Sequence, residues 1–119
     1  MSGLRVAIVG CGLIGRKRAL ALRPEDEVVA VHDATAETAA ALGSDVGADV
    51  VASLSDLLAC DPDVVIVATT HGALADIGIA SMRAGCDVLL EKPAGRVTAD
   101  VEALRQVERE TGQIAFVGF

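Results

Sequence analysis

A glycine triplet directly after an apolar run constrains the fold of this chain more than any other feature. Residues 6–15 read VAIVGCGLIG, which spaces Gly10, Gly12 and Gly15 as G-x-G-x-x-G. The first glycine of such a motif permits a tight turn, the second lets a ligand approach the backbone, and the third lets the next helix pack closely. The pattern therefore predicts a strand, a turn and a helix whose backbone faces a ligand.

A dinucleotide is the ligand that this arrangement favours. The amides of Leu13 and Ile14 open the predicted helix, where unpaired N–H groups and the helix dipole attract a pyrophosphate. Asp33 ends the next apolar run, 18 residues beyond Gly15, and would accept hydrogen bonds from the adenosine ribose hydroxyls. The alternative interpretation is a glycine-rich turn, with Asp33 capping the helix that follows it.

The residues around Asp33 also predict which dinucleotide binds. The Asp33 carboxylate would repel the 2′-phosphate of NADP. Residues 34–36 are Ala, Thr and Ala, so no arginine or lysine follows to neutralise that phosphate. The expected cofactor is therefore NAD, with NADP less favoured.

Composition and charge exclude several other classes of protein. The 119 residues are 52% hydrophobic, which suits one domain with a real core. The net charge is −7 and no basic stripe is interleaved with aromatics, which argues against a nucleic-acid partner. The basic cluster at residues 16–18 is interpreted as a solvated helix face, although it could raise the potential near a phosphate.

The cysteines and the hydropathy pattern bear on location. Cys11, Cys60 and Cys86 lack the spacing of a zinc site, so no metal is expected and the thiols should be reduced. Cys11 is expected to fill the loop, although a helix N-terminus could instead lower its pKa. No apolar run is long enough to cross a membrane and no signal peptide is recognised, so the predicted location is cytoplasmic.

Apolar runs alternate with helical patterns along the chain, which is typical of a parallel sheet wrapped by helices. Strands are expected at residues 5–9, 28–32, 49–52, 64–68, 87–90 and 114–117. Helices are expected after the glycine triplet, at 35–42 closed by Gly43, at 53–60, at 72–84, and from Thr98 to Gly112. In the last helix Glu102, Arg105 and Glu108 are expected to face water. The predicted fold class is α/β, a doubly wound Rossmann sheet of about six strands.

In such a sheet the functional loops follow the carboxyl ends of the strands. They comprise the glycine loop, Asp33, the segment Thr69, Thr70 and His71, and the segment Glu91, Lys92 and Pro93.

The later loops resemble a known family. Residues 65–95 read VIVATTHGALADIGIASMRAGCDVLLEKPAG and are similar to the N-terminal half of the Gfo/Idh/MocA oxidoreductases, whose fifth strand ends in a Glu-Lys-Pro motif. The similarity runs from Val6 to Phe119. Thr70 and His71 depart from the proline and asparagine usual in the family, and Leu74 and Cys86 from its histidine and lysine.

The resemblance implies roles for individual residues. Gly10, Gly12, Gly15 and Asp33 match cofactor residues, and Thr69 matches a threonine beside the cofactor. Thr70, His71 and Glu91 are further cofactor-binding candidates. Lys92 matches a lysine near the nicotinamide and the substrate hydroxyl, and is the catalytic candidate. The alternatives are a surface lysine on a turn for Lys92, and a loop cap rather than an acid or base for His71.

The function implied is hydride transfer between NAD and a sugar, a cyclitol or a related alcohol. Family members carry a second domain that builds the substrate pocket, and residues 1–119 comprise only the dinucleotide-binding domain. The chain alone is therefore expected to turn over negligibly, and oligomerisation is possible. The open alternatives are a reductase of a carbonyl or imine intermediate, a redox-sensing dinucleotide-binding module, and a methyltransferase.

Overall fold

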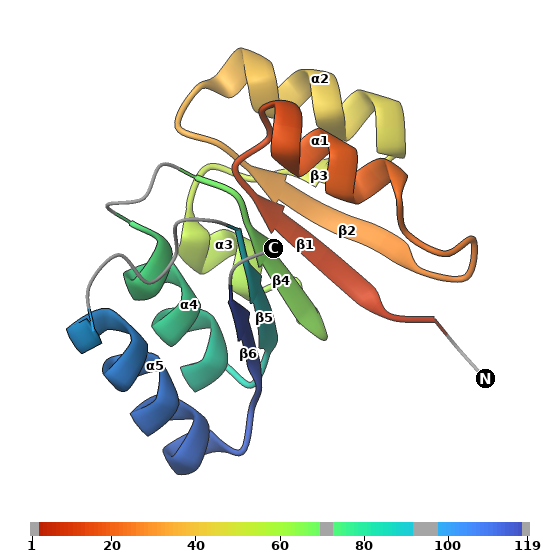
Figure 1. The fold of residues 1–119 in the computed structure, drawn as a ribbon. Helices are drawn as coiled ribbons and strands as arrows, with labels where there is room; N and C mark the ends of the chain where they lie inside the picture. The colour runs from red at the N-terminus through yellow and green to blue at the C-terminus, as the bar shows by residue number, and fades with distance from the viewer. Residues whose placement is uncertain (1–2, 70–72, 92–97, 118–119) are drawn as a thin grey trace.

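The computed structural model describes residues 3–69, 73–91 and 98–117. Its centre is a six-stranded sheet in which every pair is parallel, in the order β3-β2-β1-β4-β5-β6 (Figure 1). The strands are β1 Arg5–Val9, β2 Glu27–His32, β3 Asp49–Val50, β4 Val64–Val67, β5 Asp87–Leu90 and β6 Ala115–Val117. The helices are α1 Leu13–Leu20, α2 Ala36–Val46, α3 Leu54–Leu58, α4 Leu74–Arg83 and α5 Thr98–Thr111. The predicted fold class is confirmed.

The two faces of the sheet bury separate cores. In β1, Val6 and Ile8 pack against residues of α1 and α2, while Ala7 and Val9 pack against residues of α3, α4 and α5. Figure 1 shows the same division, with α1 and α2 on one side of the sheet and the later helices on the other. Successive side chains of a strand point to opposite faces, so a strand covered on both faces is apolar throughout.

The direction of winding reverses at β1. Its two neighbours are β2 and β4, so the chain builds outward from β1 first on one side and then on the other. Such a reversal leaves a crevice at the carboxyl ends of the central strands. The glycine loop follows β1 at this end of the sheet.

The extent of α2 differs from the sequence prediction. Gly43 does not close the helix, which continues to Val46 and ends at Gly47 in the left-handed conformation, with a φ of 71°. Gly43 is buried, and a Cβ there would lie 2.5 Å from Val50 Cγ2. Gly43 therefore meets a packing requirement, whereas Gly47 supplies the left-handed cap.

Other elements follow the predictions with small changes. Ser53 caps α3, accepting a hydrogen bond from the Asp56 amide at 3.1 Å, and the left-handed glycines Gly85 and Gly112 follow α4 and α5. In α5, Glu108 does not face water as predicted. Its carboxylate turns back to accept hydrogen bonds from the Ala115 amide and from Arg105, because the start of β6 lies beside the helix.

Candidate dinucleotide site

The three glycines of the loop meet three different surroundings. Gly10 has a φ of 95°, and a Cβ there would lie 2.6 Å from the Ala68 carbonyl. A Cβ on Gly15 would lie 1.8 Å from the Gly10 oxygen, so α1 packs on the loop only without a side chain at that position. A Cβ on Gly12 would meet nothing within 4 Å. Gly12 therefore faces open space in front of the helix.

The backbone amides of the loop divide into two groups. The Gly10 amide donates to the His32 carbonyl at 2.8 Å and the Cys11 amide donates to Asp33 Oδ2 at 2.7 Å. The first hydrogen bond of α1 runs from the Arg16 amide to the Gly12 carbonyl. Gly12 is the N-cap residue and has no side chain that could accept from the amides of the first turn. Helix geometry thus leaves the amides at the start of α1 without intrahelical acceptors, which is the arrangement that binds an anion.

Asp33 joins the two loops at this edge of the sheet. Its Oδ2 accepts from the Cys11 amide, and its Oδ1 accepts from the Thr35 amide at 2.8 Å, at the start of α2. The N-cap of α2 is Thr35 and no side chain caps the helix, so Asp33 orders the turn that enters α2 rather than capping it. An ionised carboxylate has about four acceptor positions, so Asp33 retains capacity for the two hydroxyls of a ribose.

Two hollows lie near the glycine loop and the end of β2. One, of about 420 Å³, lies between the ends of β2 and β3 and has mostly apolar walls, formed by His32, Asp33, Ala34, Ala36, Ala39, Val50, Val51 and Ala52. The other, of about 510 Å³, lies between the N-terminal parts of α1 and α2 and is lined by Cys11, Gly12, Leu13, Arg16, Glu37, Thr38 and Ala41. The first hollow thus includes the carboxylate, and the second includes part of the glycine loop.

The Cys11 thiol fills the loop. It is 2% exposed, and its Sγ donates to the His32 carbonyl at 3.5 Å. Burial, together with the negative charge of Asp33, raises the pKa of Cys11 from 9.0 to about 11. The thiol therefore stays neutral at physiological pH, as a filler should, and a thiolate activated by the helix terminus is excluded.

The loops after β4 and β5 are described only in part. Thr69 is half-buried beside Ala68, whose amide donates to the Val9 carbonyl at 2.8 Å. This places Thr69 at the same edge as the glycine loop. Thr70, His71 and Lys92 lie outside the described residues.

Glu91 is bound to α1. Its amide donates to the Val67 carbonyl at 3.0 Å, which keeps Glu91 on the sheet. Its side chain is 7% exposed and its two oxygens accept from Arg18 Nε at 2.6 Å and Nη2 at 3.1 Å. Both oxygens of this predicted cofactor residue thus have a protein partner.

The basic cluster at residues 16–18 is not simply a solvated face. Arg18 reaches Glu91, and Arg16 forms an ion pair with Asp45 of α2. Nothing in the sequence marks Arg18 for this contact, because Glu91 lies 73 residues away and only the tertiary fold brings the two together.

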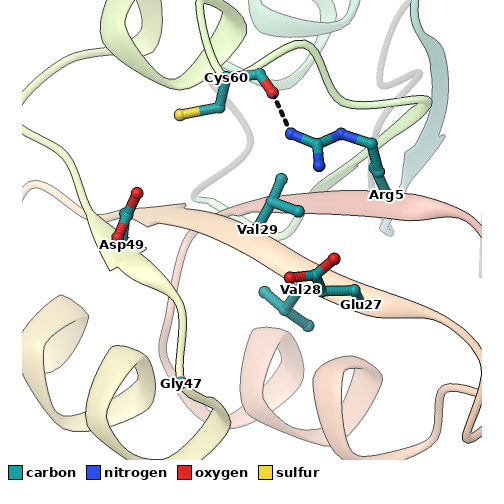
Figure 2. A pocket seen from close by; sticks show the side chains of 7 residues that line it. All are labelled: Arg5, Glu27, Val28, Val29, Gly47, Asp49 and Cys60. Carbon is teal, nitrogen blue, oxygen red and sulfur yellow. Dashed lines mark hydrogen bonds between the residues drawn. The ribbon is translucent and has the colours of Figure 1, made fainter.

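A third pocket lies at the other end of the strands, where β1, β2 and β3 begin (Figure 2). Arg5, at the start of β1, donates to the Cys60 carbonyl at 2.6 Å and to the Asp61 carbonyl at 3.2 Å. These two carbonyls belong to the turn that follows α3, so Arg5 ties that turn to the start of β1. The guanidinium therefore has a structural role, and this pocket is separate from the edge that carries the glycine loop.

The described part of the chain shows neither a metal site nor a helix suited to a membrane. Across residues 3–69, 73–91 and 98–117, no group of three His, Cys, Asp or Glu side chains is placed to hold a metal ion. None of the helices in those segments is both long and apolar enough to span a membrane.

Comparison with known proteins identifies the family. The family model GFO_IDH_MocA, described as an oxidoreductase family with an NAD-binding Rossmann fold, matches residues 4–119. This chain belongs to the Gfo/Idh/MocA oxidoreductase family. The resemblance in the Glu-Lys-Pro segment and the glycine loop is thereby confirmed, and the chain is an NAD-binding Rossmann domain.

Several Gfo/Idh/MocA relatives are similar over nearly the whole chain. The 4-carboxy-2-hydroxymuconate-6-semialdehyde dehydrogenase of Sphingobium sp. is 36% identical over 97% of this chain and 38% of its own length. Inositol 2-dehydrogenase 3 of Saccharopolyspora erythraea is 33% identical over 98% of this chain and 36% of its own. The chain thus spans less than two fifths of the length of these relatives.

A solved structure agrees with the fold. The WlbA dehydrogenase of Chromobacterium violaceum, in complex with NADH and UDP-GlcNAcA, superposes with a TM-score of 0.92 and 30% identity, over 98% of this chain and 35% of that one. The relatives are therefore longer proteins whose dinucleotide-binding part corresponds to this chain.

Proposed function

We propose that this chain is the NAD-binding domain of a dehydrogenase that transfers hydride between nicotinamide and a sugar, a cyclitol or a related alcohol. One observation carries the proposal: Gly12 faces open space directly in front of the unpaired amides of α1. A pyrophosphate requires close backbone approach at that position. NAD, when bound, supplies the nicotinamide ring that accepts or returns the hydride.

Each part of the dinucleotide has candidate partners along the edge. The amides of Leu13, Ile14 and Gly15 would hold the pyrophosphate, and Asp33 would accept from the adenosine ribose. The apolar hollow beside Asp33 has the volume and the walls to take a flat heterocycle such as adenine. With the adenosine at the end of β2 and the pyrophosphate at the end of β1, an extended dinucleotide would continue toward β4 and β5. The nicotinamide half would then have Thr69, Thr70 and His71 as its proposed neighbours.

Lys92 is the proposed catalytic residue. It directly follows Glu91 in the sequence, and Glu91 comes after β5 on the edge that carries the glycine loop. Oxidation of an alcohol needs a group that accepts the hydroxyl proton as hydride leaves, and an amine near a second cation can have a pKa low enough to do so.

NAD is favoured over NADP by two carboxylates. Asp33 is the first, and Glu37, in the first turn of α2, lines the hollow between α1 and α2. Arg16 lines the same hollow but is already paired with Asp45. A 2′-phosphate would therefore face negative charge without an unpaired arginine among these residues.

The substrate and the rest of the site are proposed from the relatives. Inositol 2-dehydrogenase and the UDP-GlcNAcA complex of WlbA support a polyol or sugar substrate class. A second domain, like the additional length of the relatives, would build the substrate pocket and could mediate oligomerisation. The free cysteines suit a reducing compartment, so we place the protein in the cytoplasm.

Gly12→Ala tests the proposal. Because the new methyl group would meet no protein atom, the thermal stability of the chain should stay close to that of the wild type. The methyl group would occupy the space through which the pyrophosphate approaches the backbone. Affinity for NADH should therefore fall by about tenfold or more, which corresponds to a loss of about 1.4 kcal/mol or more of binding free energy. Fluorescence titration with NADH measures the affinity, with little protein background because the chain has no Trp or Tyr.

The matched control is Ser55→Ala, an exposed residue in the first turn of α3. It should change neither stability nor affinity. Equal NADH affinity for the wild type and Gly12→Ala would contradict the proposal, as would a wild-type chain that binds S-adenosylmethionine in place of NADH.

A further inference from the structure

Among the ion pairs of the described residues, that between Arg18 and Glu91 joins the residues farthest apart in the chain. Its contact is bidentate and connects α1 to the residue directly after β5. Its carboxylate is 7% exposed, and Glu91 and Ser81 are the two buried polar residues among those the structure describes. The pair of Arg23 and Asp26 is also bidentate and its carboxylate is 5% exposed, but its two residues are only three positions apart. The pair of Arg83 and Glu110, by contrast, has side chains 57% and 43% exposed.

Stability does not account well for such a contact. The Glu91 carboxylate is largely removed from water, and its desolvation offsets much of its attraction to Arg18, whose side chain remains 33% exposed. A bidentate arginine contact does fix geometry, because the planar guanidinium and carboxylate meet in one orientation. The pair is therefore better suited to hold two elements in register than to stabilise the fold.

The two elements are those that the dinucleotide would bridge. Arg18 lies one turn beyond Gly15, on the helix whose first amides are the proposed pyrophosphate site. Glu91 stands at the end of β5, three strands from Asp33 on β2 in the order β2-β1-β4-β5. Neighbouring strands are about 4.8 Å apart, so the edge from β2 to β5 spans about 14 Å and accommodates an extended ligand.

We propose that Arg18 and Glu91 are a positioning pair that orients the nicotinamide half of the bound dinucleotide. The pair locks the carboxyl end of β5 to α1, and so fixes Glu91 relative to the proposed pyrophosphate site at the start of that helix. Neither side chain touches the adenosine half, whose proposed partners lie at Asp33 and in the hollow that Asp33 lines. This inference rests on the proposed function.

The experiment compares two ligands. NADH contains the nicotinamide, whereas ADP-ribose keeps the adenosine and the pyrophosphate but lacks it. Affinities for both are measured by calorimetric titration on the wild-type chain, on Arg18→Met, on Glu91→Gln and on the double variant, together with thermal unfolding. Arg83→Met, which breaks the exposed pair with Glu110, is the matched control and should leave both affinities unchanged.

The expected result is that the variants lose part of their preference for NADH over ADP-ribose. Each single variant should lose about tenfold in NADH affinity and less than about twofold in ADP-ribose affinity, the size of one charged hydrogen bond. The double variant leaves no uncompensated charge, so its thermal stability should recover. Its preference for NADH over ADP-ribose should stay reduced, and Arg18→Lys should restore that preference in part.

Two outcomes would overturn the positioning role. One is an equal loss for both ligands, and the other is a preference for NADH that recovers together with stability in the double variant. Either would mean that the pair is structural only, with the proposed function left standing. A wild-type chain that binds neither ligand would contradict the proposed function and, with it, this inference.

Discussion

Two glycines of the glycine loop, Gly15 and Gly12, differ in whether the fold leaves room for a side chain. Gly15 is excluded from carrying a side chain by the Gly10 carbonyl, a backbone atom that cannot move without shifting the turn. Gly12 is not constrained by any protein atom within 4 Å. Gly12 is thus a position that packing leaves free and that the proposed pyrophosphate would need clear.

Cys11 provides a pH-dependent prediction. Its pKa is about 11 in the folded chain against 9.0 ordinarily, so the unfolded chain loses this proton first. The stability that the neutral thiol contributes is fully present below pH 9 and is lost as pH rises to 11. Over that window the free energy of unfolding of the wild type should fall by about 2 kcal/mol more than that of Cys11→Ala.

Urea denaturation of the two chains at several pH values between 8 and about 11 measures this difference. Cys86, whose pKa is also raised by burial, is present in both chains, so its contribution cancels. Parallel curves for the two chains would contradict the prediction.

At the scale of elements, most boundaries follow from local chemistry. The strands were predictable because an apolar run of four to six residues between turn residues has few other solutions. The end of α2 was not predictable from the sequence, because a glycine near the end of a helix can be either a cap or a packing contact. Only the approach of Val50 on β3 distinguishes Gly43 from Gly47.

The contact between α2 and β3 therefore predicts a coupling between Gly43 and Val50. Gly43→Ala should lower the free energy of unfolding by about 1–3 kcal/mol, because its methyl group would lie 2.5 Å from Val50 Cγ2. In the background of Val50→Ala, which removes that atom, the same substitution should cost less, because alanine also favours the helix by about 1 kcal/mol. Urea denaturation of the four chains measures the coupling, and an equal cost in both backgrounds would refute it.

At the scale of the whole molecule, the reversal of winding at β1 brings four loops to one edge. The glycine loop, Asp33, Thr69 and Glu91 follow β1, β2, β4 and β5 respectively. Because all strands are parallel, their carboxyl ends share one side of the sheet. The site is therefore a property of the sheet rather than of any single motif.

Ligand-induced stabilisation tests the molecule as a unit. A ligand at about 100 times its dissociation constant stabilises the folded state by about 2.7 kcal/mol. NADH should therefore raise the thermal midpoint by several degrees. NADPH at the same concentration should raise it less, because Asp33 and Glu37 face its 2′-phosphate.

Differential scanning fluorimetry with an extrinsic dye measures both shifts. Asp33→Ala serves as the comparison, since it removes one of the two repelling carboxylates and should narrow the gap between NADH and NADPH. An equal or larger shift with NADPH on the wild-type chain would contradict the preference for NAD.

The sequence by itself determined the class of fold, the glycine loop and the carboxylate after β2, because each depends on residues close together in the chain. The tertiary structure alone decided that Asp33 accepts hydrogen bonds from two loops, that Gly43 packs against β3, and that Arg18 forms an ion pair with Glu91. Apart from the bond between Asp33 and the Thr35 amide, two positions away, those contacts join residues 7 to 73 positions apart. Local propensity carries no information about such partners, and only packing on a common sheet brings them within bonding distance.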